Sequence, residues 1–357
     1  LPVIGSARHM VTREIAFIGE MVAQYGPIVT VKIGRRWLWL VTAPDLIDDV
    51  LVKRASTVIK DEVTGMLKTV VGNGLLTSEG ELWKRQRRLA APALQRRHVE
   101  GYADTMTECA VAYADGLVDG EPRDLHHDMM AVTLRIVART LFGTDVHEEV
   151  GRVGAALDQA MEQFDREIHT WRIFLPQTLP TPGRRRIRQA REVLEGVVRQ
   201  YIAESRARGE GGDDLLSMLI AARDDDGSGM DDTQLVDEAI TLFVAGHETT
   251  ALVLTFAQLA LASAPEAAAR LDAELRDVLG GRPPTLADMA KLPYTNAVVK
   301  ETMRVHPPAW IVGRETAEPI ELGGYVVPKG HTVLVPIYWL HRNPVHFPDP
   351  ERFDPER

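Results

Sequence analysis

The chain has 357 residues, 45% of them hydrophobic and 26% charged, and a formal net charge of −10 at pH 7. This size allows one large domain with a substantial core, and no apolar run reads as a membrane segment. The acidic balance excludes a general nucleic-acid binder, because no overall basic field collects phosphates. A single cysteine, Cys109, excludes a disulfide framework and fits a reducing cytoplasm. We therefore expect a cytoplasmic monomer.

The first elements in the chain are predicted to be a hairpin, a short helix and a long loop. Residues 27–41 alternate between apolar and polar side chains around Gly34 and Arg35, which is typical of a hairpin with a two-residue turn. Residues 43–52 place their apolar side chains on one side, as a short helix does. Residues 60–80 have weak periodicity and read as a long loop, and loops of that length are often functional.

A strongly basic helix is predicted from Glu81. Trp83 and Arg87 share one of its faces at i, i+4 spacing. Three further basic residues point elsewhere: Lys84, Arg85 and Arg88. One interpretation is a solvated helix anchored by one tryptophan. The other is a local basic face on an acidic protein, which would steer an acidic electron donor.

The middle of the chain reads as further helices. Residues 99–143 are helical in pattern, and Cys109 among them reads as ordinary core. Residues 150–164 and 184–208 predict two more helices, joined by an apolar, proline-broken linker that is either a movable lid or a rigid surface loop. Three histidines show no metal-ligand spacing and read as solvated or capping residues: His126, His127 and His147.

The chain is organised around one long helix, predicted over residues 231–264. Asp231 or Asp232 is its N-cap and Pro265 ends it. At about 1.5 Å per residue it would be roughly 50 Å long. Residues 239–262 are apolar on nearly every face, which predicts a helix buried all round.

Polar residues interrupt this apolar run at Ala245-Gly246-His247-Glu248-Thr249-Thr250. A glycine, a carboxylate and two threonines are each unfavourable inside a buried helix. One interpretation is a kink lined by a satisfied polar patch. In the other, Ala245, Gly246 and Thr249 leave a groove for a small ligand beside a hydroxyl donor, with Glu248 relaying protons through water.

The last third contains two helices and a hairpin. Residues 266–279 form an amphipathic helix, and the helix after Pro293 places Glu301 and Arg304 at i, i+3, close enough for an ion pair. An exposed pair of this kind would contribute little to stability. Residues 320–335 read as a clean β-hairpin.

Four of these motifs, in this order, resemble the cytochrome P-450 family over essentially the whole chain. They are Trp-x-x-x-Arg at 83–87, Ala-Gly-x-Glu-Thr at 245–249, Glu-x-x-Arg at 301–304 and Pro-Glu-Arg at 355–357. The resemblance implies a mostly α fold with small β-sheets (α+β), built as a single domain over 1–357. It also implies haem b as cofactor.

Several roles follow from the resemblance alone. Trp83 and Arg87 would bind the haem propionates, since an indole N–H and a guanidinium suit carboxylates. Arg314 falls where the family places another propionate partner. O2 would bind in the groove at Ala245 and Gly246.

Two polar residues of the long helix would act on the oxygen. Thr249 would donate a hydrogen bond to it while Glu248 helps to deliver protons. The buried network behind the haem would contain three further residues: Glu301, Arg304 and Arg357.

The sequence departs from the family at the axial ligand. The family holds haem iron by a cysteine in a Phe-x-x-Gly-x-x-x-Cys-x-Gly loop, expected soon after Arg357. Cys109 lacks that glycine-rich surround. We therefore expect a fragment truncated at both ends, with the metal ligand beyond Arg357 and residues missing before Leu1. The 357 residues alone are expected to be catalytically inactive.

The resemblance implies a monooxygenase that inserts one oxygen atom of O2 into a C–H bond. Apolar candidate pocket residues favour a terpene, fatty acid, steroid or polyketide-like substrate. They are Leu75, Leu76, Leu242, Ala245, Ile311 and Val312. No flavin or nicotinamide fingerprint is present, so electrons from NAD(P)H would arrive through a ferredoxin reductase and a ferredoxin, with a peroxide-driven variant as the alternative.

Two other function classes remain open from the sequence. A haem-free protein of the same fold that binds a hydrophobic ligand would be favoured if the gene ends at Arg357. A metallohydrolase built on His247 and Glu248 would need a second histidine at i+4 from His247, which the sequence lacks.

Overall fold

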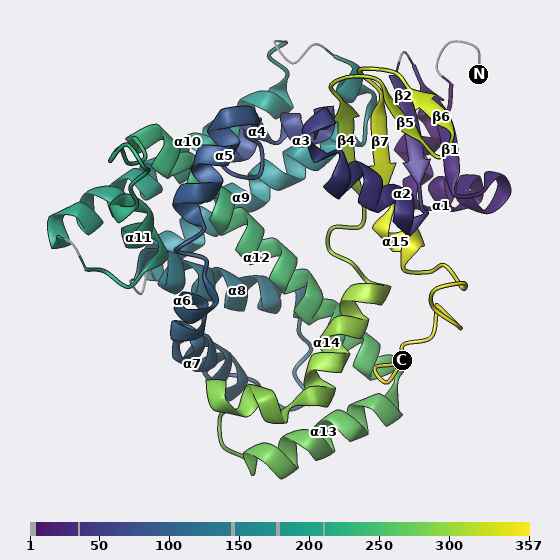
Figure 1. Cartoon of the computed structure of the whole chain (residues 1–357). Helices are drawn as coiled ribbons and strands as arrows, with labels where there is room; N and C mark the ends of the chain where they lie inside the picture. Colours follow the sequence, from purple (N-terminus) through teal and green to yellow (C-terminus); the bar gives the residue numbers. More distant parts are fainter. Residues whose placement is uncertain (1–4, 35, 144–146, 176–178, 210) are drawn as a thin grey trace. The chain divides into compact units, whose positions relative to one another are not determined.

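The computed structural model describes residues 5–34, 36–143, 147–175, 179–209 and 211–357. These residues are mainly helical and form two small sheets (Figure 1), which confirms the predicted class. Packing divides the chain into two compact units. Unit 1 contains Leu1–Lys68, Glu162–Arg185 and Ala309–Arg352, and unit 2 contains Thr69–Met161, Arg186–Pro308 and Phe353–Arg357. The single domain predicted over 1–357 stays a prediction.

Helices and short strands alternate near the two ends of the chain, and the elements between them are helices. Up to residue 142 the elements are α1 (Ala7–Tyr25), β1 (Ile28–Ile33), β2 (Arg36–Val41), α2 (Pro44–Asp48), the π-helix η1 (Asp49–Lys53), the 3₁₀-helix η2 (Ala55–Thr57), β3 (Val58–Lys60), α3 (Glu62–Met66), α4 (Lys68–Val71), α5 (Gly80–Ala90), α6 (Arg96–Gly101), α7 (Ala103–Asp115) and α8 (Leu125–Phe142). The later elements are α9 (His147–Ile168), the 3₁₀-helix η3 (Trp171–Phe174), α10 (Pro182–Arg208), α11 (Leu215–Ala221), α12 (Asp232–Ser263), α13 (Pro265–Leu279), the 3₁₀-helix η4 (Leu286–Lys291), α14 (Pro293–Val305), β4 (Val312–Thr316), β5 (Ile320–Leu322), β6 (Tyr325–Val327), β7 (Thr332–Val335) and α15 (Ile337–Leu340).

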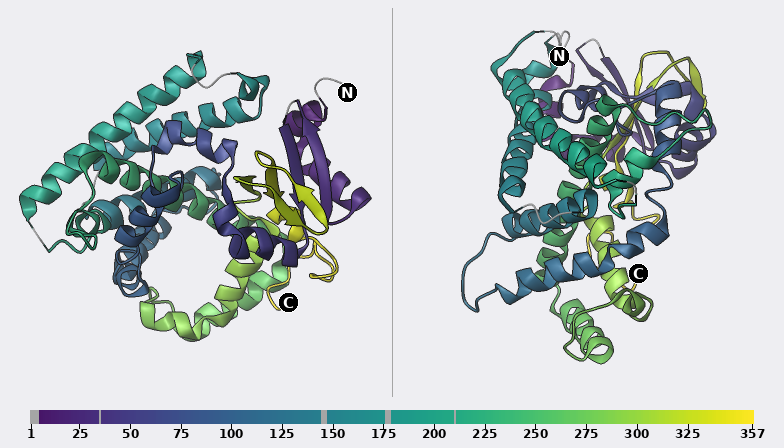
Figure 2. Two further views of the ribbon diagram at one scale, coloured as in Figure 1. Left: turned by 45° about the horizontal axis from the view of Figure 1, so that its top comes forward. Right: turned by 90° about the vertical axis from the view of Figure 1, so that its left-hand side faces the viewer.

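A five-stranded sheet in the order β1-β2-β7-β4-β3 forms the centre of unit 1. β2 and β7 are parallel and the other neighbours are antiparallel. Side chains alternate along β2, so Leu38 and Leu40 pack in the cluster that includes α1, while Trp39 and Val41 pack in the cluster on the other face. Figure 2 shows α1 beside this sheet from two further directions. The sheet is therefore buried on both faces.

The predicted first hairpin and the short helix after it are found where the sequence placed them. β1 and β2 pair with Ile33 opposite Arg36, which confirms the hairpin, and Gly34 has a φ of +59°. Arg35, the other predicted turn residue, lies outside the described residues. The predicted short helix 43–52 is α2, and it continues as η1.

The loop predicted over residues 60–80 is wrong in its first half. Residues 62–66 and 68–71 form α3 and α4. Asp61 starts α3 by accepting hydrogen bonds from the backbone N–H groups of Val63 and Thr64. Neither helix exceeds two turns, which is too short for a helical period to stand out in the sequence. Residues 72–79 between α4 and α5 remain a loop.

The single hairpin predicted over residues 320–335 is also wrong in part. β5 and β6 do pair as a hairpin. β7, however, pairs with β2 and β4 in the five-stranded sheet. The pairing of β2 with β7 joins residues almost 300 positions apart, and alternation along β7 does not specify its partner.

The predicted helices of the middle and end of the chain are present. The pattern over 99–143 comprises α6, α7 and α8, and the later helices are α9, α10 and α13. Asp214 caps α11 by accepting from the N–H of Ser217. The linker between α9 and α10 contains η3, and residues 176–178 lie outside the described part, so lid and rigid loop both stay open.

α12 runs without interruption from Asp232 to Ser263 (Figure 1), which confirms the predicted long helix. Asp231 and Gln234 form a reciprocal capping box at its start. The expectation that it is buried all round is wrong, because Ala245, Thr249 and Thr250 are exposed. Among the described residues it is also the one helix with the length and composition of a membrane span, a test that core helices pass as well.

Candidate active site

The exposed side chains of α12 form a stripe at the interrupted apolar run. Ala245 and Thr249 lie one helical turn apart, and both are exposed in unit 2. The Thr249 hydroxyl donates to the Ala245 carbonyl oxygen at 2.5 Å. A threonine hydroxyl in this arrangement can turn to another acceptor by rotation about χ1. The stripe thus combines a small side chain with a mobile hydroxyl donor, and the helix passes it without a kink.

Gly246 has a different setting from its neighbours. A Cβ built at this position would lie 3.1 Å from Val137 Cγ2 of α8. The missing side chain therefore lets α8 approach α12 closely. Gly246 is half-buried against α8, whereas Ala245 is exposed, so the sequence prediction that both residues open the same groove does not describe how the helix presents them.

His247 is turned into the protein. It is 1% exposed, and its Nε2 lies 3.0 Å from the Met130 carbonyl oxygen of α8. Burial lowers its pKa below the usual value. This position suits a neutral core histidine. Because His247 is turned into the protein, it is not available as the first ligand of a zinc site built on His247 and Glu248. Over the described ranges, no group of three or more His, Cys, Asp or Glu side chains is placed to hold a metal ion.

The Trp-x-x-x-Arg residues lie together on α5. The Arg87 guanidinium carbon lies 5.2 Å from the centroid of the Trp83 ring. Arg87 is exposed, and no carboxylate among the described residues forms an ion pair with it. A stacked, unpaired guanidinium is well suited to bind an external carboxylate.

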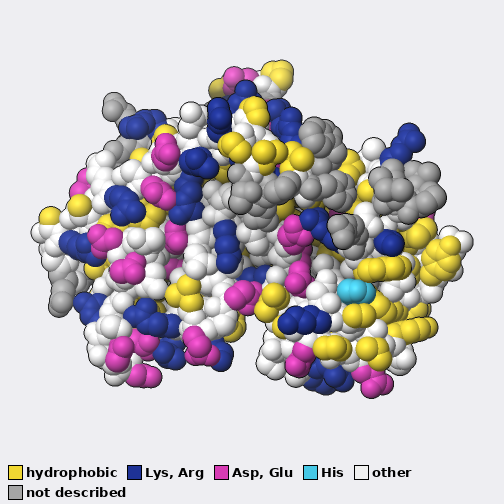
Figure 3. All heavy atoms as spheres, turned by 90° about the horizontal axis from the view of Figure 1, so that it is seen from above, with side chains coloured by type: hydrophobic (Ala, Val, Ile, Leu, Met, Phe, Trp, Pro, Cys, Tyr) yellow, Lys and Arg dark blue, Asp and Glu magenta, His cyan; other side chains and the backbone are white. Residues whose placement is uncertain are grey.

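The other basic residues of α5 are paired within the chain, which corrects the expectation of a free basic face. Lys84 bonds to Glu81 at 2.7 Å. Arg85 and Arg88 both bind Asp224, at 3.2 and 2.7 Å, and so fasten α5 to the acidic turn before α12. Asp224 cancels part of their charge. On the molecular face seen in Figure 3, basic and acidic side chains are likewise interspersed.

Glu301 and Arg304 form a buried pair in unit 2, and Arg357 reaches the same carboxylate from the surface. Glu301 binds Arg304 through two hydrogen bonds of 2.7 and 2.8 Å, and both side chains are at most 7% exposed. Arg357 Nε lies 3.3 Å from Glu301, and the backbone N–H of Asp354 donates to the same oxygen at 2.9 Å. The pair that looks exposed and weak from its spacing alone is therefore fully desolvated.

The remaining site residues fall in both units. Leu75 and Leu242 are half-buried and Leu76 is exposed, all in unit 2. Ile311, Val312 and Arg314 belong to unit 1, with Val312 and Arg314 on β4. Among the described residues Arg314 forms no ion pair, and its Nη1 donates to the Gly313 carbonyl oxygen at 2.8 Å.

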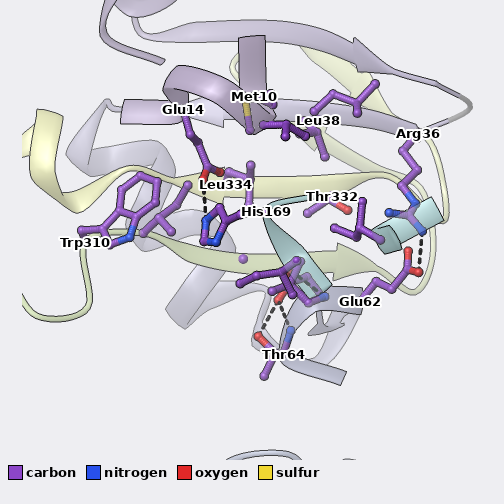
Figure 4. Close-up of a pocket in the computed structure, with 18 residues that line it drawn as sticks. Met10, Glu14, Arg36, Leu38, Glu62, Thr64, His169, Trp310, Thr332 and Leu334 are labelled. Carbon is purple, nitrogen blue, oxygen red and sulfur yellow. Dashed lines mark hydrogen bonds and ion pairs between the residues drawn. The ribbon is translucent and has the colours of Figure 1, made fainter. Parts of the chain in front are cut away.

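Unit 1 contains a cavity of about 250 Å³ that no pattern in the sequence indicates (Figure 4). α1, α3, η3 and strands of the sheet line it, mostly with apolar side chains such as Met10, Leu38 and Trp310. Ile311 is the one candidate pocket residue that lines it. Polar groups at its edge are paired, for example Arg36 with Glu62 at 2.5 Å. The mostly apolar lining of this cavity therefore favours an uncharged, apolar group.

An ionic cluster at the cavity edge joins α1 to the end of α9. His169 Nε2 lies 3.3 Å from Glu14, and its Nδ1 lies 2.8 Å from Asp165. The hydrogen-bonded Glu14, aided by Asp165, raises the pKa of His169 from 6.5 to about 9. Because the folded pKa exceeds the unfolded one, the contribution to stability is complete below pH 6.5 and is lost as the pH rises through 9.

This cluster gives a first testable prediction. When the pH is raised from about 6 to about 10, the free energy of unfolding should fall further in the wild-type protein than in the His169→Gln variant. The difference should be at most about 1 kcal/mol, because the His169 side chain is partly exposed. Urea unfolding at both pH values measures the difference. Equal losses in the two proteins would show that the ion pair does not contribute to folding.

Cys109, the one cysteine of the sequence, does not belong to the exposed stripe. It is 3% exposed on α7, and Arg139 Nη1 donates to its sulfur at 3.6 Å. This setting agrees with its interpretation as core and offers no open thiolate to a metal.

The whole chain, residues 1–357, matches the family model described as cytochrome P-450. It is 37% identical to cyclooctatin synthase of Streptomyces melanosporofaciens, covering 100% of this chain and 78% of that protein. It is 35% identical to pentalenene oxygenase of Streptomyces avermitilis, covering 100% of this chain and 79% of that protein. Among solved structures, the retinoic acid-bound cyanobacterial CYP120A1 has the same fold, with a TM-score of 0.86 at 24% identity over 100% of this chain and 80% of that one.

The family match and the relatives agree with the motifs found in the sequence. Another relative, cyclooctat-9-en-7-ol 5-monooxygenase of Streptomyces melanosporofaciens, is 35% identical over 100% of this chain and 78% of its own. Together they show an enzyme of the oxygenase class. The chain belongs to the cytochrome P-450 family, as a member of bacterial type.

Proposed function

We propose that this chain belongs to a haem monooxygenase that acts on a terpene-type hydrocarbon. It would contribute the residues beside the bound O2 and those that bind the haem propionates. The observation that carries the proposal is the exposed stripe on α12, where Ala245 and Thr249 interrupt an otherwise apolar helix. The names of the relatives, pentalenene oxygenase and cyclooctat-9-en-7-ol 5-monooxygenase, favour a terpene-type substrate over a fatty acid, steroid or polyketide.

On α5 and α12 of unit 2, the residues present fit haem. Arg87, stacked on Trp83 and without an ion pair among the described residues, would hold a propionate. From the family resemblance, Arg314 would hold another. Ala245 would face the macrocycle with a side chain small enough to leave room for O2. Cys109 does not fit as axial ligand because it is buried beside Arg139. Haem, when bound, supplies the reductive activation of O2.

The protein's own contribution is proton supply, orientation and exclusion of water. Inserting one oxygen atom into a C–H bond and releasing the other as water consumes two electrons and two protons. Thr249 would donate its hydroxyl proton toward the oxygen being reduced, and Glu248 would replace that proton from water. Apolar side chains, among them Leu75, Leu76 and Leu242, together with Ile311 and Val312, would orient the hydrocarbon.

Electrons would come from NAD(P)H through a ferredoxin reductase and a ferredoxin, in the cytoplasm, to a monomeric enzyme. The net charge of −10 supports an enzyme that does not bind nucleic acid. Because Asp224 pairs with Arg85 and Arg88, a ferredoxin would meet less positive charge on α5 than the sequence suggests.

The test of the function uses the protein expressed from its complete reading frame. The reduced, carbon monoxide-bound absorption spectrum should show the red-shifted band of thiolate-ligated haem. With a ferredoxin and its reductase, pentalenene should gain one oxygen atom, measured by mass spectrometry under ¹⁸O₂. A protein that takes up no haem but binds the hydrocarbon would instead support the haem-free ligand binder.

A second prediction concerns haem retention. Arg87→Met should release haem to apomyoglobin about tenfold faster, because a charge-assisted bond to a propionate is lost. Arg97→Met is the matched control, since Arg97 is also exposed and bonds only to its neighbour His98 among the described residues. Equal release from both variants would remove Arg87 from the proposed haem site.

A further inference from the structure

Residues 72–78 of the loop between α4 and α5 are held against the first turns of α12 by two adjacent carboxylates. Asp237 Oδ2 accepts from the backbone N–H of Asn73 at 2.7 Å. Glu238 Oε2 accepts from the backbone N–H of Leu75 at 3.0 Å. Both carboxylates are at most 6% exposed. Buried charges on a helix thus bind the main chain of the loop that carries Leu75 and Leu76.

The loop sequence is adapted to this contact. Gly72 has a φ of +76°, and a Cβ there would overlap the Asp237 carboxylate. A Cβ at Gly74 would overlap the Thr241 hydroxyl. The Gln86 amide of α5 donates to the Asn73 carbonyl oxygen at 2.9 Å, which holds the loop from its other side.

The same Asp237 carboxylate also binds α10. Its Oδ1 accepts from Arg191 Nη2 at 2.6 Å, while Arg191 Nε bonds to Glu195 at 2.6 Å. One buried carboxylate therefore joins three segments: the 72–78 loop, α10 and α12. α10 follows the apolar linker after η3. A displacement of α10 would move Arg191, and the Asp237 carboxylate that holds the loop would then lose its counter-charge.

We infer that Asp237 is a positioning residue that fixes Leu75 and Leu76 against the substrate and couples their loop to α10 through Arg191. The inference rests on the proposed function only in taking these leucines as substrate-facing. Asp237 acts through the loop and touches no reacting atom. Replacing Asp237 should therefore have a large effect on which carbon of the hydrocarbon is oxidised. Its effect on the rate of oxygen reduction should be smaller.

Hydrogen exchange tests the anchor in the complete protein without any need for turnover. Asp237→Ala should speed exchange of the Asn73 amide about tenfold, the loss expected for one hydrogen bond to a charged group. Asp232→Asn is the matched control, because Asp232 on the same helix pairs with Arg206 of the same α10 at 2.6 Å but is 57% exposed. The control should leave residues 72–78 unchanged.

Product distribution tests the positioning role. With pentalenene as the probe, Asp237→Ala should alter the ratio of mono-oxygenated isomers and raise KM several-fold, with a smaller change in kcat. Arg191→Met should shift the isomer ratio in the same direction while keeping the Asn73 amide protected, since that bond does not involve Arg191. Asp232→Asn should give the wild-type ratio.

Three results separate the possible failures. Unchanged exchange in Asp237→Ala overturns the anchor, and faster exchange with an unchanged isomer ratio overturns the positioning role. A wild-type enzyme that does not oxidise pentalenene counts against the proposed function, and the exchange rates then decide the inference alone. Asp237→Asn, which keeps one acceptor oxygen, replaces the alanine variant if that variant does not fold.

Discussion

Replacing Glu301 with alanine is expected to lower the free energy of unfolding by about 3–5 kcal/mol, because it leaves a buried guanidinium without its counter-charge. Arg304 is 6% exposed, and its Nε and Nη2 both donate to Glu301. The same carboxylate also binds Arg357 and the backbone of Asp354, so its removal frees the 353–357 segment from α14 as well. Urea unfolding followed by circular dichroism measures the loss.

Two variants make this prediction specific to the buried charge. Glu301→Gln keeps an acceptor oxygen and should lose less than the alanine variant. Glu162→Ala removes the partner of Arg166 in an exposed i, i+4 pair and should cost only about 0.3–0.5 kcal/mol. A Glu301→Ala loss as small as that of Glu162→Ala would mean that water reaches Arg304 and that the cluster does not hold the fold.

Replacing Thr249 with alanine is expected to divert most reducing equivalents from product to hydrogen peroxide. Without the hydroxyl donor, O2 that has received two electrons and two protons leaves as peroxide before its O–O bond is cleaved. Correctly placed proton transfer contributes about 10²–10⁴-fold to rates, so product formed per NAD(P)H should fall by about tenfold or more. Peroxide and product are quantified in the same reaction.

Thr250→Ala is the matched control for this experiment. Thr250 is the next residue of α12 and is also exposed, but one position along a helix turns its side chain by roughly 100° from that of Thr249. Its variant should couple electrons to product as the wild type does. Equal uncoupling by the two variants would assign the effect to the helix backbone, and unchanged coupling in Thr249→Ala would remove the proposed proton role.

The elements that were predicted correctly have all their determinants close together in the sequence. α12 begins at the Asp231 capping box and ends before Pro265, and the β1–β2 hairpin is set by alternation around Gly34. The family follows from four motifs in order. By contrast, α3 and α4 are too short for a period to show, and the strand order depends on pairings between distant segments.

For the candidate site, the sequence identified the residues but not their environments. It placed Trp83 and Arg87 on one face, yet it did not show that Asp224 cancels part of the charge of Arg85 and Arg88 from more than 130 positions away. It grouped Ala245 with Gly246, whereas Gly246 packs against Val137 of α8 and Ala245 is exposed. Burial and ion pairing depend on both of the residues that are in contact. A local sequence pattern contains only one of those two residues.

We could predict the long helix, the first hairpin, the mostly helical class and the family from the sequence, because local hydrogen bonding, periodicity and motif order are all encoded within short segments. Three features are visible only in the folded chain: the Glu301 pair is buried, β7 pairs with β2, and Asp237 binds Asn73 across 164 positions of chain. Those contacts form when chain closure brings distant segments together, and their strength depends on the water that the whole fold excludes.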